Sequence, residues 1–169
     1  DKNILVDTGC PASIIKKFWP EPSEDVQSFE DALNRVGLKP EEIDLVIQTH
    51  AHFDHCGNTS KCVNAKVVIQ EDELKFALSP HPLFTGNYSR DLIRGWKYLI
   101  VKGDQDVFKG IRVLYTPGHS PGTQSVAVET SKGTAIIAGF CCLQENFKPP
   151  AEIPWDVFTP GIHTDALAA

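Results

Sequence analysis

The sequence has no methionine at any of its 169 positions, including the first. It begins Asp1-Lys2-Asn3 and continues directly into a strand-like apolar segment at residues 4–6, so it lacks the basic and apolar stretches of a signal peptide. We therefore expect a cytoplasmic protein whose chain is incomplete at both ends. The alternative is that modified methionines are missing from the sequence.

Long apolar runs and clusters of positive charge are also missing. No segment approaches the ~20 apolar residues of a membrane-spanning helix. The formal net charge is −6 and the 16 lysines and arginines are dispersed, which argues against nucleic acid and anionic membranes as partners. At 41% apolar residues, the chain can bury a sizeable core. Residues 1–169 thus predict one domain with a small-molecule partner, and the oligomeric state stays open.

The five cysteines do not predict a disulfide framework, because their number is odd and two of them are adjacent. They are Cys10, Cys56, Cys62, Cys141 and Cys142. The spacing of Cys56 and Cys62 is not followed by a second pair at ligand distance, so packing is favoured over a zinc finger. We interpret all five as thiols.

Apolar periodicity alternates between strands and helices in the first half of the chain and predicts strands after about residue 98. The expected strands are residues 3–7, 43–49 and 65–70, and the expected helices are residues 24–36, capped by Ser23, and residues 71–78. Residues 98–101, 107–108 and 111–115 predict a meander, and residues 124–129 and 134–138 predict a hairpin. Residues 79–88 predict a loop with exposed Phe84 and Tyr88, of a kind that often covers a site.

Three imidazoles and one carboxylate stand within six residues, His50-Ala51-His52-Phe53-Asp54-His55, after a predicted buried strand. If the chain is still extended there, His50 and His52 point the same way and can bind one metal ion as neutral imidazoles. Asp54 and His55 follow where the strand turns into a loop or helix, so they can reach a second ion. Surface or carbonyl-bonded histidines are the alternative, but four ligand-type residues in six favour a metal site.

A further histidine lies between two Pro-Gly turns, in Thr116-Pro117-Gly118-His119-Ser120-Pro121-Gly122. Such a backbone is tightly specified, as a ligand position requires. A turn histidine facing water is the alternative, but beside the first motif His119 is expected to be the third imidazole. Three histidines and a water molecule form a common open set for catalytic zinc.

With these motifs the chain resembles the metallo-β-lactamase superfamily over nearly its whole length. The resemblance is carried by Ile4-Leu5-Val6-Asp7-Thr8-Gly9, His50-x-His52-x-Asp54-His55 and Thr116-Pro117-Gly118-His119. It implies an α+β fold, the αββα sandwich, with metals at one edge of the two sheets. It also implies that His50, His52 and His119 bind the first metal and that Asp54 and His55 bind the second. Within the superfamily, the motifs are most similar to those of the N-acyl homoserine lactone lactonases.

Three departures from the family pattern concern the second metal and the substrate. Phe140 stands where the family has an Asp that bridges both metals, and Cys141 could replace it only if the strand bulges. Leu143 stands where the lactonases usually have a Tyr that helps to hold the substrate carbonyl. The last family His has no clear match, and His163 comes too soon after Phe140 to be expected as a ligand. We therefore expect a weak or empty second site.

The predicted activity is hydrolysis of an ester, lactone or thioester by a metal-bound hydroxide, with zinc as the metal and iron or manganese left open. Asp54 is the expected catalytic residue, which takes the proton of the water molecule and delivers it to the leaving group. An iron-dependent oxidoreductase or sulfur dioxygenase on the same fold is the second hypothesis. A catalytically inactive metal-binding relative is the third.

Overall fold

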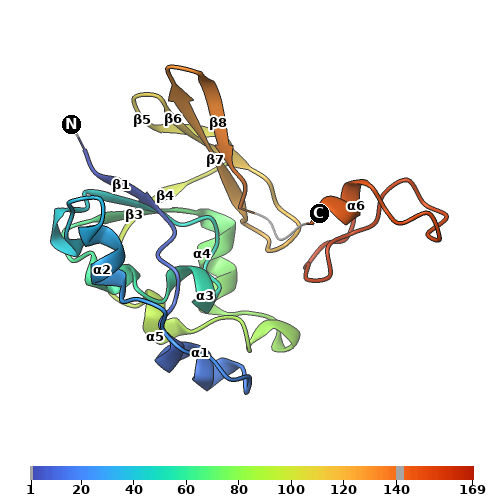
Figure 1. Cartoon of the computed structure of the whole chain (residues 1–169), viewed down its shortest axis with the longest axis horizontal. Helices are drawn as coiled ribbons and strands as arrows, with labels where there is room; N and C mark the ends of the chain where they lie inside the picture. The colour runs from blue at the N-terminus through green and yellow to red at the C-terminus, as the bar shows by residue number, and fades with distance from the viewer. Residues whose placement is uncertain (1, 140–142) are drawn as a thin grey trace.

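Two four-stranded sheets make up the centre of the molecule, as the computed structural model in Figure 1 shows; it describes residues 2–139 and 143–169. The first sheet is parallel, in the order β1-β2-β3-β4. Its strands are β1 (Ile4–Val6), β2 (Leu45–Ile47), β3 (Lys66–Gln70) and β4 (Lys97–Val101). The second sheet is antiparallel, in the order β5-β6-β7-β8. Its strands are β5 (Gln105–Phe108), β6 (Ile111–Tyr115), β7 (Gln124–Thr130) and β8 (Gly133–Ile137).

Short helices connect the strands of the first sheet. They are α1 (Ala12–Phe18), α2 (Phe29–Asn34), α3 (Phe53–Cys56), α4 (Glu71–Leu78) and α5 (Arg90–Ile93), with 3₁₀ turns at Pro40–Glu42, Thr59–Lys61 and Pro82–Phe84. A last short helix, α6 (Gln144–Phe147), follows the second sheet. None of the helices in the described ranges is long and apolar enough to cross a membrane.

Side-chain alternation along the parallel strands divides the core into two layers. Val46, Val67 and Ile69 face a cluster that also contains Leu33 of α2 and Leu74 of α4. Leu45, Ile47 and Val68 point the other way and pack with Val113 and Val126 of the second sheet. Because successive strand residues face opposite sides, one parallel sheet buries a helix layer and a second sheet at once.

Buried glutamines join the two sheets at the carboxyl end of β2. The Gln124 backbone N–H donates to the Thr49 carbonyl at 2.9 Å, and its side-chain Nε2 donates to the Gln48 carbonyl at 2.8 Å. Gln70 Nε2 donates to Gln124 Oε1 at 3.0 Å. The start of β7 is therefore held against the segment that leads into His50.

Several local predictions are confirmed. The helix at residues 71–78 is α4, the hairpin is β7–β8, and the strands at residues 3–7, 43–49 and 65–70 are present but shorter at one or both ends. The described cysteines, Cys10, Cys56 and Cys62, are free thiols.

The helix predicted over residues 24–36 is wrong in its first half. Helix α2 starts at Phe29 and is capped by Ser28, whose hydroxyl accepts from the Asp31 N–H at 3.0 Å, and not by Ser23. Asp25 instead accepts the backbone N–H of Ala12 at 2.8 Å, which holds the preceding segment against the start of α1. Val26, which lies within the predicted helix, is consequently 96% exposed and outside the observed one.

The predicted meander and the predicted exposure of Tyr88 are also wrong. Strand β4 pairs in parallel with β3 and belongs to the first sheet, because its alternating residues complete that sheet's two cores. Only β5 and β6 of the expected meander pair with each other. Tyr88 is only 6% exposed and packs in the core against the helix layer, with Phe84 partly buried beside it.

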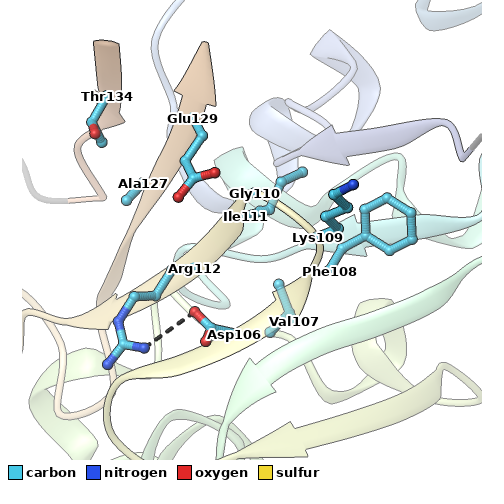
Figure 2. A pocket seen from close by; sticks show the side chains of 10 residues that line it. All are labelled: Asp106, Val107, Phe108, Lys109, Gly110, Ile111, Arg112, Ala127, Glu129 and Thr134. Atoms are coloured by element: carbon cyan, nitrogen blue, oxygen red, sulfur yellow. Dashed lines mark hydrogen bonds and ion pairs between the residues drawn. The ribbon is translucent and has the colours of Figure 1, made fainter.

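A cavity of about 540 Å³ lies on the second sheet at the β5–β6 turn, away from the predicted metal ligands (Figure 2). Its lining includes Phe108 and Ala127, and an ion pair joins Arg112 to Asp106 at 3.1 Å. Strand β6 runs from this turn toward His119, so the cavity and the histidine stand at opposite ends of the strand. Its position therefore separates it from the candidate site.

Candidate metal centre

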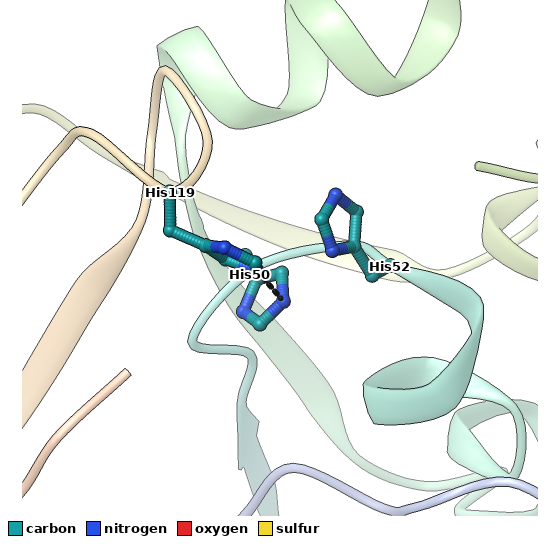
Figure 3. Close-up of side chains that lie close together, drawn as sticks. All are labelled: His50, His52 and His119. Atoms are coloured by element: carbon teal, nitrogen blue, oxygen red, sulfur yellow. Dashed lines mark hydrogen bonds between the residues drawn. The ribbon is translucent and has the colours of Figure 1, made fainter. Parts of the chain in front are cut away.

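Three histidines from two segments meet at one edge of the two sheets (Figure 3). His50 follows β2, His52 precedes α3 as its N-cap residue, and His119 lies in the loop between β6 and β7. One ligand atom from each lies within 4.8 Å of the others, and all three side chains are buried. The structure therefore brings together the three residues predicted for the first metal.

The proton of the His50 ring is placed by a chain of two hydrogen bonds. The Thr49 hydroxyl donates to Asp7 Oδ2 at 2.7 Å and lies 3.0 Å from His50 Nδ1. Because the hydroxyl proton is already used on the carboxylate, Thr49 can only accept from His50. The ring proton is thus on Nδ1, and the lone pair of Nε2 is free.

The same reasoning applies to His119. Its Nδ1 lies 2.9 Å from the carbonyl oxygen of Ile162, which can only accept, so Nδ1 carries the proton and Nε2 is bare. The two bare atoms, His50 Nε2 and His119 Nε2, lie 3.1 Å apart. His52 Nε2 is buried and has no hydrogen-bond partner among the described residues. Imidazole lone pairs that converge without donors fit a bound cation, and such outer hydrogen bonds to Nδ1 are typical of metal-binding histidines.

Burial keeps the three rings in the ligand form. It lowers the pKa of His50 well below its ordinary value and lowers that of His52 to about 3, and the neighbouring histidines add to both effects. The pKa of His119 is also lowered, mainly by burial. Neutral imidazole is the form that binds a metal, so the site needs no deprotonation at neutral pH.

Asp54 and His55 lie beside the triad, at the start of α3. The His55 ring centroid is 4.0 Å from that of His50, and Asp54 Oδ2 is 3.7 Å from His55 Nε2. His55 Nδ1 is 2.8 Å from Asp7 Oδ2. Burial opposes the charged form of His55, but the hydrogen bond to Asp7 and the charges of Asp7 and Asp54 together outweigh it and raise the pKa. Neither Asp54 nor His55 belongs to the cluster of three, so their role at a second metal stays a prediction.

The other residues singled out in the sequence contribute little to this geometry. Phe140 and Cys141 lie outside the described residues. The Leu143 side chain is 71% exposed. His163 is not in the cluster, and its Nδ1 lies 2.7 Å from the Pro160 carbonyl oxygen.

Asp7 organises the site, although the sequence reasoning gave it no role of its own. Its carboxylate accepts from the side chain of Gln48 at 2.8 Å, from the backbone N–H and hydroxyl of Thr49 at 2.8 and 2.7 Å, and from His55. Asp7 also has a φ of +53°, an uncommon conformation outside glycine. The position of Asp7 in the sequence could have indicated this role. A carboxylate at the carboxyl end of β1 reaches the carboxyl end of the adjacent parallel strand β2.

Two packed sheets with three convergent neutral imidazoles at one edge define a metal-dependent α/β protein. A sequence model described as the metallo-beta-lactamase superfamily matches residues 1–167. The chain belongs to this superfamily.

Curated relatives and solved structures agree with this assignment. The N-acyl homoserine lactonase AiiA of Bacillus thuringiensis subsp. kurstaki is 31% identical, over 97% of this chain and 68% of its own length. The lactonase AttM of Rhizobium radiobacter is 32% identical, over 71% of this chain and 48% of its own length. A crystal structure of a B. thuringiensis AiiA variant with bound N-decanoyl-L-homoserine matches 98% of this chain and 66% of the solved chain, with a TM-score of 0.76 and 30% identity. The chain thus spans about two thirds of the length of the AiiA proteins.

The comparisons confirm the predicted family, its fold and the class of metallo-hydrolase. They also agree with the prediction that the site binds metal. The identity of the metal and the number of ions stay predictions, as do the roles of the individual residues.

Proposed function

We propose that this chain is a zinc-dependent hydrolase that opens the ring ester of N-acyl homoserine lactones or chemically similar lactones. The observation that carries the proposal is the convergence of His50, His52 and His119. The ring protons of His50 and His119 are directed to neighbouring oxygens, and Nε2 of His52 has no hydrogen-bond partner among the described residues. A second support is a solved N-acyl homoserine lactone hydrolase with N-hexanoyl-L-homoserine at its catalytic metal centre, which is 30% identical with a TM-score of 0.74.

The proposal extends to the setting of the site. Residues 1–169 are taken as one metallo-β-lactamase-like domain with a small-molecule substrate and a cytoplasmic location. Asp54 and His55 are assigned to a weak second site. The lactonase relatives favour hydrolysis over the second hypothesis, iron redox chemistry.

A divalent ion held by the three histidines would polarise the lactone carbonyl and make a water molecule acidic at neutral pH. The chain's own residues then have two tasks. Asp7, acting through the Thr49 hydroxyl, holds the ring proton of His50 on Nδ1. The Ile162 carbonyl does the same for His119. The Asp54 carboxylate, which is about one third exposed, accepts the proton of the attacking water.

The overall step is balanced within the substrate and water. A bond forms between the water oxygen and the carbonyl carbon, and the bond from this carbon to the ring oxygen breaks. Asp54 passes the proton to the departing ring oxygen, which becomes the hydroxyl of the opened hydroxy acid. The step consumes no oxidant or reductant.

The test is ring opening of N-hexanoyl and N-decanoyl homoserine lactone by the zinc-loaded chain, measured by chromatography of the acid product. Thioester and β-lactam panels measured in parallel define the substrate class. His119→Ala should abolish turnover and weaken zinc binding, whereas His81→Ala should change neither, because His81 is exposed and far from the triad in sequence. A zinc-loaded chain without lactonase activity, or an active His119→Ala variant, would contradict the proposal.

A second variant separates the proton carrier from the ligands. Asp54→Asn should retain one tightly bound zinc and lose about 10²–10⁴-fold in kcat, the usual contribution of a general acid or base. Metal content by mass spectrometry should show one tightly held ion per wild-type chain. Two such ions would contradict the assignment of a weak second site.

A further inference from the structure

Glu73 is a fully buried carboxylate on α4, with an exposed fraction of 0%. None of the ion pairs formed by the described residues includes it. Burial raises the pKa of this carboxyl, and hydrogen bonds from its neighbours act in the opposite direction. A buried carboxylate without a cationic partner destabilises the folded protein unless hydrogen-bond donors satisfy both of its oxygens. The donors to Glu73 therefore indicate what this side chain does.

The donors to Glu73 come from both segments that carry the metal triad. The backbone N–H of Ala51, between His50 and His52, donates to Oε1 at 2.8 Å. The Ser120 hydroxyl, next to His119, donates to Oε2. One carboxylate therefore bonds on one side to the His50–His52 segment and on the other to the His119 loop.

A third donor comes from the same loop as Ser120. The backbone N–H of Gly122 donates to Glu73 Oε2 at 3.1 Å. A Cβ added to Gly122 would overlap the backbone and Cβ of Glu73, so only glycine lets the loop approach α4 this closely.

The fourth donor, Tyr88, also packs against the ring of His52. The Tyr88 hydroxyl donates to Glu73 Oε1 at 3.1 Å, and the Tyr88 ring centroid lies 4.7 Å from that of His52 at a steep angle. Tyr88 and His52 also form an isolated antiparallel bridge through their backbones. Glu73 thus bonds to residues that lie next to all three histidines, and none of its hydrogen bonds within the described residues involves a histidine.

We infer that Glu73 is a positioning residue for the metal triad, which holds the His119 loop against the His50–His52 segment through Ala51, Ser120, Gly122 and Tyr88. Because this inference rests on the proposed metal site, its test measures metal binding directly. The geometry makes a clear demand: Glu73 must offer acceptors on both oxygens. An amide at this position turns its NH2 group toward the backbone N–H of either Ala51 or Gly122, neither of which can accept a hydrogen bond, and so breaks one side of the link.

The experiment compares Glu73→Gln with the matched control Glu71→Gln, which lies two residues earlier on the same helix and forms exposed ion pairs with Lys75 and Lys102. Zinc affinity is measured by competition with a chromophoric chelator, and the visible spectrum of the cobalt-loaded chain reports ligand geometry. Thermal unfolding is recorded with zinc and with excess chelator. Glu73→Gln should lower zinc affinity by about 10–100-fold, as loss of outer-shell support typically does, and should change the cobalt spectrum. Glu71→Gln should match the wild type.

A purely structural role predicts a different pattern. In that case Glu73→Gln lowers the melting temperature equally with and without metal, while zinc affinity and the cobalt spectrum stay unchanged, and the inference is overturned. If Glu73→Gln does not fold, the variants Ser120→Ala and Tyr88→Phe test the inference instead, because each removes one hydrogen-bond donor to Glu73. Smaller losses of zinc affinity in both support the inference, and wild-type affinity in both overturns it. Failure of the wild-type chain to bind zinc would instead refute the proposed function.

Discussion

Thr49→Val is the most direct test of how the protein selects the ligand form of His50. Valine keeps the shape of threonine but removes the hydroxyl that donates to Asp7 at 2.7 Å and lies 3.0 Å from His50 Nδ1. Loss of the charge-assisted bond leaves a partly buried carboxylate and costs about 1.5–3 kcal/mol, and loss of the neutral bond at the buried His50 costs about 0.5–1.5 kcal/mol. We expect the metal-free protein to lose about 2–4.5 kcal/mol of stability, or roughly 4–18 °C in Tm for a chain of this size.

The metal-binding effect of Thr49→Val follows from the position of the ring proton. Without an acceptor beside Nδ1, the proton of His50 is free to move to Nε2, where it blocks the ligand lone pair. Zinc affinity should therefore fall about 10–100-fold, which corresponds to about 1.4–2.7 kcal/mol.

Chelator competition measures this affinity, and chemical unfolding in excess chelator measures the stability of the metal-free protein. Thr49→Ser is the matched control, since it keeps the hydroxyl and should retain near wild-type affinity. Wild-type zinc affinity in a folded Thr49→Val variant would refute the reasoning. So would an equal loss in both variants.

Three further outcomes are expected. Gly122→Ala should destabilise the protein by about 1–3 kcal/mol through overlap with Glu73, whereas Gly86→Ala, with open space around it, should be nearly neutral in denaturant unfolding. The folded-state pKa of His52 is lowered to about 3, so the unfolded state takes up its proton first as the pH falls, and stability is lost below about pH 6.5. Between pH 7 and pH 5 the metal-free protein should lose about 2 kcal/mol through this group, and an equal pH dependence in His52→Gln would contradict that assignment. Ser28→Ala should cost about 1 kcal/mol through loss of the α2 cap, and an unchanged unfolding midpoint would argue against the cap.

Local chemistry made part of the fold predictable. The run of acidic residues at the start of α4 and the turn residues of the β7–β8 hairpin act within a few positions, and both elements were predicted close to their observed bounds. Helix α2 was predicted too long because its beginning depends on Asp25, which bonds to the distant N–H of Ala12. Strand β4 was assigned to the wrong neighbours because strand pairing joins residues far apart in the sequence.

The candidate site shows the same division. Residue types and spacing within two short motifs were enough to single out His50, His52 and His119 as candidate ligands of one metal, and the structure brings these three residues together. They did not identify the carboxylates that support these rings, because Asp7 and Glu73 lie on other elements and reach the site only through the sheet and α4.

The sequence by itself determined which side chains can bind a metal, since that ability belongs to the imidazole group and to its local spacing. Only the tertiary structure decided that the three rings converge and that burial keeps them neutral. It also decided that Thr49 and the Ile162 carbonyl hold two of the ring protons on Nδ1, away from the converging Nε2 atoms. The physical reason is that burial and hydrogen-bond direction depend on which distant segments pack together. Packing of β2, β6 and α4 at one edge turns separate histidines into a single site.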